Sequence, residues 1–178
     1  MSLAVAALAR VPDWTAVPTT GVASGPTDGP PGPRPIGGAT IDLAEETWKR
    51  TCGRPTPCDD LATSSTDLAR PWGTRNPRWR LVVHVPLANV DTAAGAACPC
   101  YIAAWVADDP ADDDGLPGVD AAPGTAGHGV LIVRGAAWAG RDLSADVEAL
   151  VAKPCRRSAL LCPGSVVQSW GVVGPAPP

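Results

Sequence analysis

Five aspartates fall within the seven residues Asp108–Asp114, and charges this close must be screened by solvent or by a cation. Calcium takes six to eight oxygen ligands, often from closely spaced Asp side chains with glycine at the sharp turn. Residues 112–115 have the D-x-D-G pattern of such loops, but Pro110 replaces one expected ligand and no closing Glu follows. One interpretation is a solvated acidic turn. The other is a calcium site, with calcium as the cofactor, formed by Asp109, Asp112, Asp114 and Asp120.

Six cysteines form three local pairs, and an even number in a loop-rich chain is typical of disulfides formed in an oxidising compartment. The spacing favours Cys52–Cys58 and Cys155–Cys162 as short disulfide loops, although sequence leaves the pairing open. A bridge between Cys98 and Cys100 would be strained, so these two could instead pair elsewhere. Free buried thiols are one alternative. Zinc is another, but there is no C-x2-C pair and there are only two histidines.

Tryptophans and arginines lie close together around residues 70–80. Trp72 and Trp79 enclose the run GTRNPR, and arginines occupy positions 70, 75, 78 and 80. One interpretation is an arginine–tryptophan ladder that binds a sugar or a neighbouring subunit. The other, which we favour, is a core tryptophan bordered by arginines. A chain without phenylalanine must use its seven tryptophans as large apolar side chains.

The histidines, His84 and His128, are the candidates for general base chemistry. His84 lies in an apolar run, and His128 follows the aspartate-rich stretch between two glycines. No nucleophile elbow, glycine-rich phosphate loop or H-E-x-x-H motif accompanies them. We therefore expect a protein that is not an enzyme.

Length and charge set the broad class. The 178 residues suggest one domain, and a net charge of −4 provides no electrostatic footprint for nucleic acid or for an anionic membrane surface. The 19 glycines and 21 prolines predict long loops. The apolar run Leu3–Ala9 is far shorter than the roughly 20 residues that span a membrane. Membrane contact would therefore require a segment absent from this chain.

Short helices and a linker are predicted in the first half of the chain. Ser2–Arg10 has helical character until Pro12 ends it. Ten of the fourteen residues in Gly25–Gly38 are Gly or Pro, which predicts a linker or an extended surface loop. Leu43–Arg50 is predicted as a helix because Asp42 and Glu45 resemble a capping box and Glu/Lys and Glu/Arg pairs follow at i,i+4.

The second half changes to the periodicity of strands. In the first of them Trp79, Leu81, Val83 and Val85 are expected on one face. No helical pattern separates the strands, so we predict an antiparallel sheet and an α+β fold, with the N-terminal helix and the Trp72 region as candidate covers. The five predicted strands are Arg78–Val85, Tyr101–Ala107, Gly129–Trp138, Ala145–Ala152 and Ser165–Val173.

Five runs of the sequence carry a resemblance to a known family. They are ARVPDWTAV (9–17), RPWGTRNPRWRL (70–81), CYIAAWVADDPADDDG (100–115), GHGVLIVRGAAW (127–138) and VVQSWGVV (166–173). Together they resemble the PilX-like minor pilins of bacterial type IV pili, over about residues 3 to 173.

The resemblance implies a pilin fold, in which an N-terminal helix packs against an antiparallel sheet. It divides a single domain into a helix remnant (1–11), a connecting αβ region (12–77), the sheet (78–173) and a tail (174–178). Such proteins carry a hydrophobic helical half ahead of the matched region, so we expect that it was removed before Met1 or is supplied by a partner chain. We favour removal.

The function implied by the resemblance is that of a structural subunit. The chain would contact other pilin subunits through its N-terminal helix, and it would lie in a pilus at the cell surface after assembly from the inner membrane and periplasm. Two alternatives stay open at this point. One is a secreted calcium-binding adhesive module that is not tied to a filament, and the other is a small secreted hydrolase.

Overall fold

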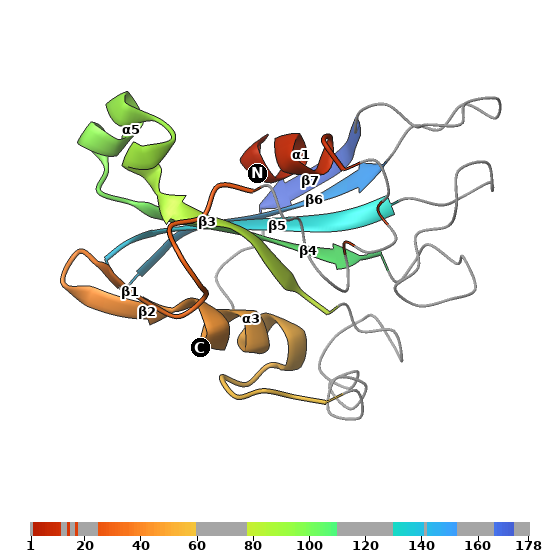
Figure 1. Ribbon diagram of the computed structural model, residues 1–178, viewed down its shortest axis with the longest axis horizontal. Helices are drawn as coiled ribbons and strands as arrows, with labels where there is room; N and C mark the ends of the chain where they lie inside the picture. Colours follow the sequence, from red (N-terminus) through yellow and green to blue (C-terminus); the bar gives the residue numbers. More distant parts are fainter. Residues whose placement is uncertain are drawn as a thin grey trace.

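The computed structural model combines short helices with two antiparallel sheets (Figure 1). It describes residues 2–11, 14, 17, 25–59, 78–109, 130–140, 142–152 and 166–172. The helices are α1 (Ser2–Leu8), α3 (Leu43–Cys52), the 3-10 turn η3 (Leu87–Asn89) and α5 (Thr92–Ala97). The strands are β1 (Pro33–Ile36), β2 (Ala39–Asp42), β3 (Arg80–Pro86), β4 (Tyr101–Asp108), β5 (Val130–Ala139), β6 (Asp142–Ala152) and β7 (Val166–Val172). The predicted α+β class with antiparallel sheets is confirmed.

The larger sheet has the order β3-β4-β5-β6-β7, so neighbours in sequence are neighbours in space. Every adjacent pair is antiparallel. One expectation was wrong, because η3 and α5 do lie between β3 and β4. This insertion is a short helical turn and a six-residue helix, and it leaves the two strands antiparallel neighbours rather than forming a crossover to a parallel strand.

The predicted alternation along β3 is wrong beyond Leu81. A β-bulge shifts the register between Leu81 and Val83. Trp79 and Leu81 therefore pack in one hydrophobic cluster, whereas Val82 and Val83 belong to the cluster on the opposite face. A bulge inserts one residue into a strand and so reverses the facing of everything after it.

Both faces of the sheet are covered, by different elements. On one face, α1 places Ala4, Ala7 and Leu8 in a cluster with residues of β3, β4, β5 and β6. Trp14 joins this cluster and donates its indole hydrogen to the carbonyl of Leu8 at 3.1 Å, which supports the end of α1. On the other face lie α3 and the β1–β2 hairpin, as Figure 1 shows. The Trp72 region, the other expected cover, lies outside the described residues.

The glycine- and proline-rich stretch Gly25–Gly38, predicted as a linker or an extended surface loop, is not a linker. It contains β1, which pairs with β2 through a two-residue turn at Gly37 and Gly38. Both glycines have positive φ, 54° and 80°, as a type I′ hairpin turn requires. A Cβ on Gly37 would also lie 2.9 Å from the Cα of Gly140 in the neighbouring sheet connection. This hairpin could not be predicted from composition, because its strands are only four residues long.

Helix α3 was predicted nearly to its ends. The Asp42 carboxylate accepts hydrogen bonds from the backbone N–H of Ala44 and Glu45, at 2.8 and 3.2 Å. Gly53 ends the helix in the left-handed conformation, with φ of 69°, and donates its N–H to the Lys49 carbonyl. These caps fix both ends of α3 and thereby orient the side chains that it presents to β3 and β4.

Candidate functional site

The predicted calcium ligands are described only in part. Asp109 follows β4 directly and is 8 % exposed, whereas Asp112, Asp114 and Asp120 lie outside the described residues. Glu148 is a half-buried carboxyl on β6, and its pKa is raised. Burial is the largest cause, and the negative charges of Asp146 and Asp109 add to it. Within the described ranges, no group of three His, Cys, Asp or Glu side chains is placed to hold a metal ion.

Four of the six cysteines are described, and they form two disulfides. Cys52 is bonded to Cys58, the pairing that the spacing favoured. Cys98 is bonded to Cys100, whereas the sequence left open that these two pair elsewhere. Pro99 lies at the centre of a tight turn in which the Cys100 N–H donates to the Cys98 carbonyl at 2.6 Å, and this brings the two Cα atoms to 5.1 Å. Cys155 and Cys162 lie outside the described residues.

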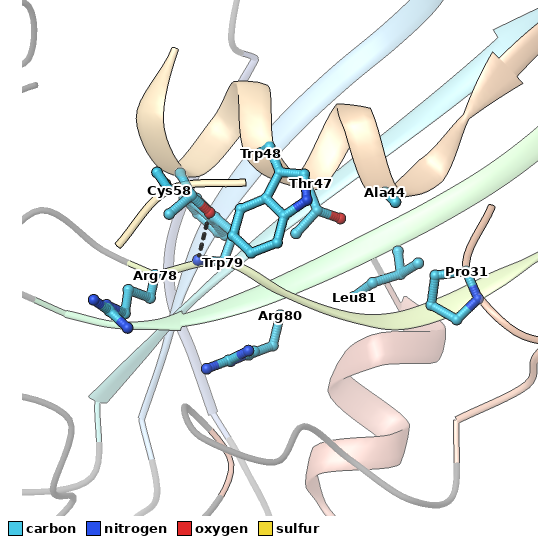
Figure 2. Close-up of a pocket in the computed structure, with 10 residues that line it drawn as sticks. Pro31, Ala44, Thr47, Trp48, Cys58, Arg78, Trp79, Arg80 and Leu81 are labelled. Carbon is cyan, nitrogen blue, oxygen red and sulfur yellow. Dashed lines mark hydrogen bonds between the residues drawn. The ribbon is translucent and has the colours of Figure 1, made fainter. Parts of the chain in front are cut away.

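A pocket of about 300 Å³ lies between α3 and the start of β3 (Figure 2). In Figure 2, Thr47 and Trp48 of α3 lie on one side of β3, and Arg80 extends from the other side. The Trp79 backbone N–H donates to the Thr51 hydroxyl at 3.3 Å, which holds the two walls together. The described lining is Pro31, Ala44, Thr47, Trp48, Thr51, Cys58, Arg78, Trp79, Arg80 and Leu81.

The pocket can accommodate a small molecule, but the described residues that line it include no acid–base pair. Its charged side chains are Arg78 and Arg80, and Cys58 is in a disulfide. Trp79 is 4 % exposed and packs in the core cluster, which agrees with a core tryptophan bordered by arginines. In the described part of the chain the Trp79 indole N–H has no hydrogen-bond partner. A volume of this size is at the lower end for small-molecule sites.

A buried ionic network lies behind the pocket and fixes α3 on the sheet. The Arg50 guanidinium lies 3.9 Å from the ring centre of Trp105. One of its nitrogens donates to Glu46 at 2.7 Å, and another lies 3.7 Å from Asp146. Arg134 makes a bidentate pair with Asp146, at 2.8 and 2.7 Å. Burial opposes ionisation of Glu46, but hydrogen bonds from Lys49 and Arg50 lower its pKa overall.

Thr47 connects this network to the pocket. Its hydroxyl accepts the indole N–H of Trp105 at 2.8 Å and donates to the Leu43 carbonyl at 2.7 Å. The sequence identified the Glu46/Arg50 and Glu45/Lys49 pairs from their i,i+4 spacing, and both are present. The role of Asp146 could not be predicted from the sequence, because an ion pair between residues distant in the chain leaves no local pattern around a residue of β6. The network is therefore a structural support for the α3 wall.

The second polar cluster joins Asp28 to His84 of β3. One carboxylate oxygen of Asp28 accepts hydrogen bonds from Tyr101 at 2.9 Å, from Arg34 at 3.0 Å and from His84 Nδ1 at 3.1 Å. Burial would raise the pKa of Asp28, but the bonds from Arg34, Tyr101 and His84 lower it. Burial lowers the pKa of His84 and, with the Asp28 carboxylate, raises that of Tyr101.

This cluster attaches a chain segment to the sheet. His84 also exchanges backbone hydrogen bonds with the segment, since its N–H donates to Pro26 and its carbonyl accepts from Asp28, each at 3.1 Å. An Asp–His pair can orient an imidazole for base catalysis. Here the His84 side chain is 4 % exposed and is therefore shielded from solvent. The pair instead attaches residues 26–28 to the outer edge of β3. His128 lies outside the described residues.

Comparison with known proteins provides no relative from which to transfer a function. No family model, no curated protein and no solved structure matches the chain. Among the described residues, no helix is long and apolar enough to cross a membrane.

Proposed function

We propose that this chain is a non-catalytic, pilin-like structural subunit of a surface filament of the type IV pilus class. The observation that carries the proposal is the packing of α1 on the sheet. Its buried residues Ala4, Ala7 and Leu8 pack on a five-stranded antiparallel sheet whose strands follow one another in sequence. This arrangement agrees with a helix-on-sheet subunit, and the runs of sequence that resemble PilX-like minor pilins support the same assignment.

The two sides of α1 would then have different roles. One side is buried on the sheet, while Ser2 and Ala6 are exposed, as are Ala9 and Arg10 just after the helix. The small exposed side chains would let a helix of another subunit approach closely, as packed helices require. The opposite side of the sheet, with α3 and the pocket, would face outward and contact neighbouring subunits or targets. The exposed side of α1 is therefore the expected site of assembly contacts.

Filament preparations test this proposal. The chain, expressed from its own gene, is expected in the fraction sheared from the cell surface, and antibody-gold labelling should mark filaments. Ala6→Arg should reduce incorporation at least about tenfold, equivalent to about 1.4 kcal/mol at the assembly contact, while the protein still folds. Ala97→Arg on the exposed part of α5 is the matched control and should incorporate normally.

Two outcomes would contradict the proposal. The chain could be absent from sheared filaments and present only in the culture medium, or both arginine variants could incorporate as well as the original chain. The first outcome would favour the second candidate, a secreted calcium-binding adhesive module. What favours that candidate is the buried position of Asp109 in the aspartate-rich run, where its negative charge contributes to the raised pKa of Glu148.

A further inference from the structure

We propose that the bridge between Cys98 and Cys100 is a thiol–disulfide exchange site, which a dithiol can open and the corresponding disulfide can close again while the fold stays intact. This inference goes beyond the proposed function and does not depend on it. It rests on three properties of the Cys98-Pro99-Cys100 turn: the connectivity of its ring, its position on the surface and the backbone contacts that hold its two ends.

Ring connectivity distinguishes this bridge from the other described disulfide. A single residue separates Cys98 from Cys100, so the ring contains two planar peptide bonds and the fixed φ of Pro99. Five residues lie between Cys52 and Cys58, which gives that loop more freedom to reach a relaxed disulfide. A disulfide in a constrained ring is easier to reduce than a relaxed one.

Position makes the Cys98–Cys100 bridge accessible. Both cysteines are partly exposed, and Pro99 between them is exposed. They follow α5, which Figure 1 shows projecting from the end of the sheet at the connection between β3 and β4. In the other described bridge, Cys52 is 5 % exposed at the end of α3, whereas Cys58 is partly exposed. An incoming thiolate can therefore reach both sulfurs of the Cys98–Cys100 bridge without local unfolding, but only the Cys58 side of the other bridge.

Backbone contacts hold both ends of the turn without the bridge. The Cys98 N–H donates to the Ala94 carbonyl at 2.9 Å, and the Cys100 carbonyl accepts from Leu87 at 2.8 Å. Strand β4 begins at Tyr101 and is paired on both sides, with β3 and β5. Reduction would therefore leave the two thiols close together, and the bridge could form again.

The exchange needs a two-electron donor, which we assign to the class of dithiols. A thiolate of the dithiol attacks one sulfur of the bridge, the Cys98–Cys100 bond breaks, and the released cysteine thiolate takes up a proton. The second thiol of the donor loses a proton and attacks the donor's own sulfur in the mixed disulfide, which releases the second cysteine. The donor ends as a disulfide, and Cys98 and Cys100 end as thiols.

Redox titration of the whole chain tests the inference. The oxidised protein is equilibrated in buffers of reduced and oxidised dithiothreitol, quenched with N-ethylmaleimide and analysed by peptide mass, so that each cysteine is assigned separately. Circular dichroism follows the fold in the same samples. We expect Cys98 and Cys100 to open at a dithiol-to-disulfide ratio at least about tenfold lower than Cys52 and Cys58, which corresponds to about 30 mV, with the fold unchanged.

Two double variants provide matched controls. Cys52→Ser with Cys58→Ser should leave the titration of Cys98 and Cys100 in place, and Cys98→Ser with Cys100→Ser should remove the early transition while the protein still folds. The inference is overturned if both bridges open at the same ratio, or if opening coincides with loss of the fold. It is equally overturned if Cys98 and Cys100 are alkylated before any reductant is added, or are found bonded to other cysteines.

Discussion

At the scale of single residues, the clearest chemistry is the attachment of three donors to one oxygen of Asp28. His84, Tyr101 and Arg34 come from β3, β4 and β1, so a single carboxylate joins three elements. The sequence identified His84 only as a candidate base and placed Asp28 in a linker or surface loop, because the contact spans 56 positions of the chain. We therefore expect protonation of His84 to affect stability.

His84 should make stability fall as the solution becomes acidic. Because burial lowers its pKa in the folded state, the unfolded chain binds the proton more readily below the ordinary pKa of 6.5. The free energy of unfolding should therefore fall from about pH 7.5 toward pH 5, with a slope of at most about 1.4 kcal/mol per pH unit. The pKa of Asp28 is also lowered in the folded state, so its protonation should reduce stability only at lower pH, below about 3.8.

Urea unfolding at pH 5, 6, 7 and 8 measures this effect, with His84→Gln as the comparison. Both proteins keep His128, so the difference between the two profiles isolates His84. The variant should show a flatter profile over this range. Parallel profiles for the two proteins would show that His84 does not carry the pH dependence.

Calcium is the second prediction at this scale, and it depends on the sequence pattern at residues 109–120 together with the buried position of Asp109. If the site forms, calcium in excess of its dissociation constant by about 100-fold should add about 2.7 kcal/mol to the free energy of unfolding. Asp112→Asn with Asp114→Asn should abolish the increase, and Asp91→Asn, at the cap of α5, should leave it. No heat on titration and no change in melting temperature at millimolar calcium would exclude the site.

At the scale of elements, local signals were sufficient where the determining contacts are local. Helix α3 was predicted from Asp42, Glu45 and its i,i+4 pairs, and the strands of the larger sheet from their apolar runs. The β1–β2 hairpin was missed because four-residue strands rich in proline have no period to detect. The bulge in β3 was missed because Leu81 and Val83 satisfy the same alternation that the bulge interrupts.

Asp146 should be among the most sensitive positions of the α3 layer. It is 5 % exposed and faces both Arg134 and Arg50, so Asp146→Asn leaves two largely buried guanidinium groups with less compensation. We expect a loss of about 3 kcal/mol in the free energy of unfolding. Glu45→Gln, in an exposed pair with Lys49, is the matched control and should change it by less than about 0.5 kcal/mol. Chemical denaturation compares them, and equal losses would show that the buried network is not a support of α3.

At the scale of the whole molecule, the sequence predicted five successive strands in an antiparallel sheet but not the second covered face. Neighbouring antiparallel strands need only short connections, so their order can be read along the chain. Which element covers a face depends on contacts between distant residues, such as Leu43 with the β4 and β5 residues of its cluster. The sheet therefore separates two cores, one under α1 and one under α3 with the hairpin.

These two cores should unfold as one cooperative unit, because every central strand contributes side chains to both. Leu8 and Leu43 are each 0 % exposed, on opposite faces of the sheet. Leu8→Ala and Leu43→Ala should each lower the free energy of unfolding by about 2 to 5 kcal/mol. Because the two residues belong to separate clusters, the double variant should lose the sum within about 0.5 kcal/mol.

Denaturant unfolding followed by tryptophan fluorescence and by far-ultraviolet circular dichroism provides the measurement. Coincident transitions are expected for all three variants. If α1 were only loosely attached, Leu8→Ala would separate the two signals into two steps or leave the main transition unchanged. That result would also remove the main support for a pilin-like subunit, since the proposal requires α1 to be an integral layer on the sheet.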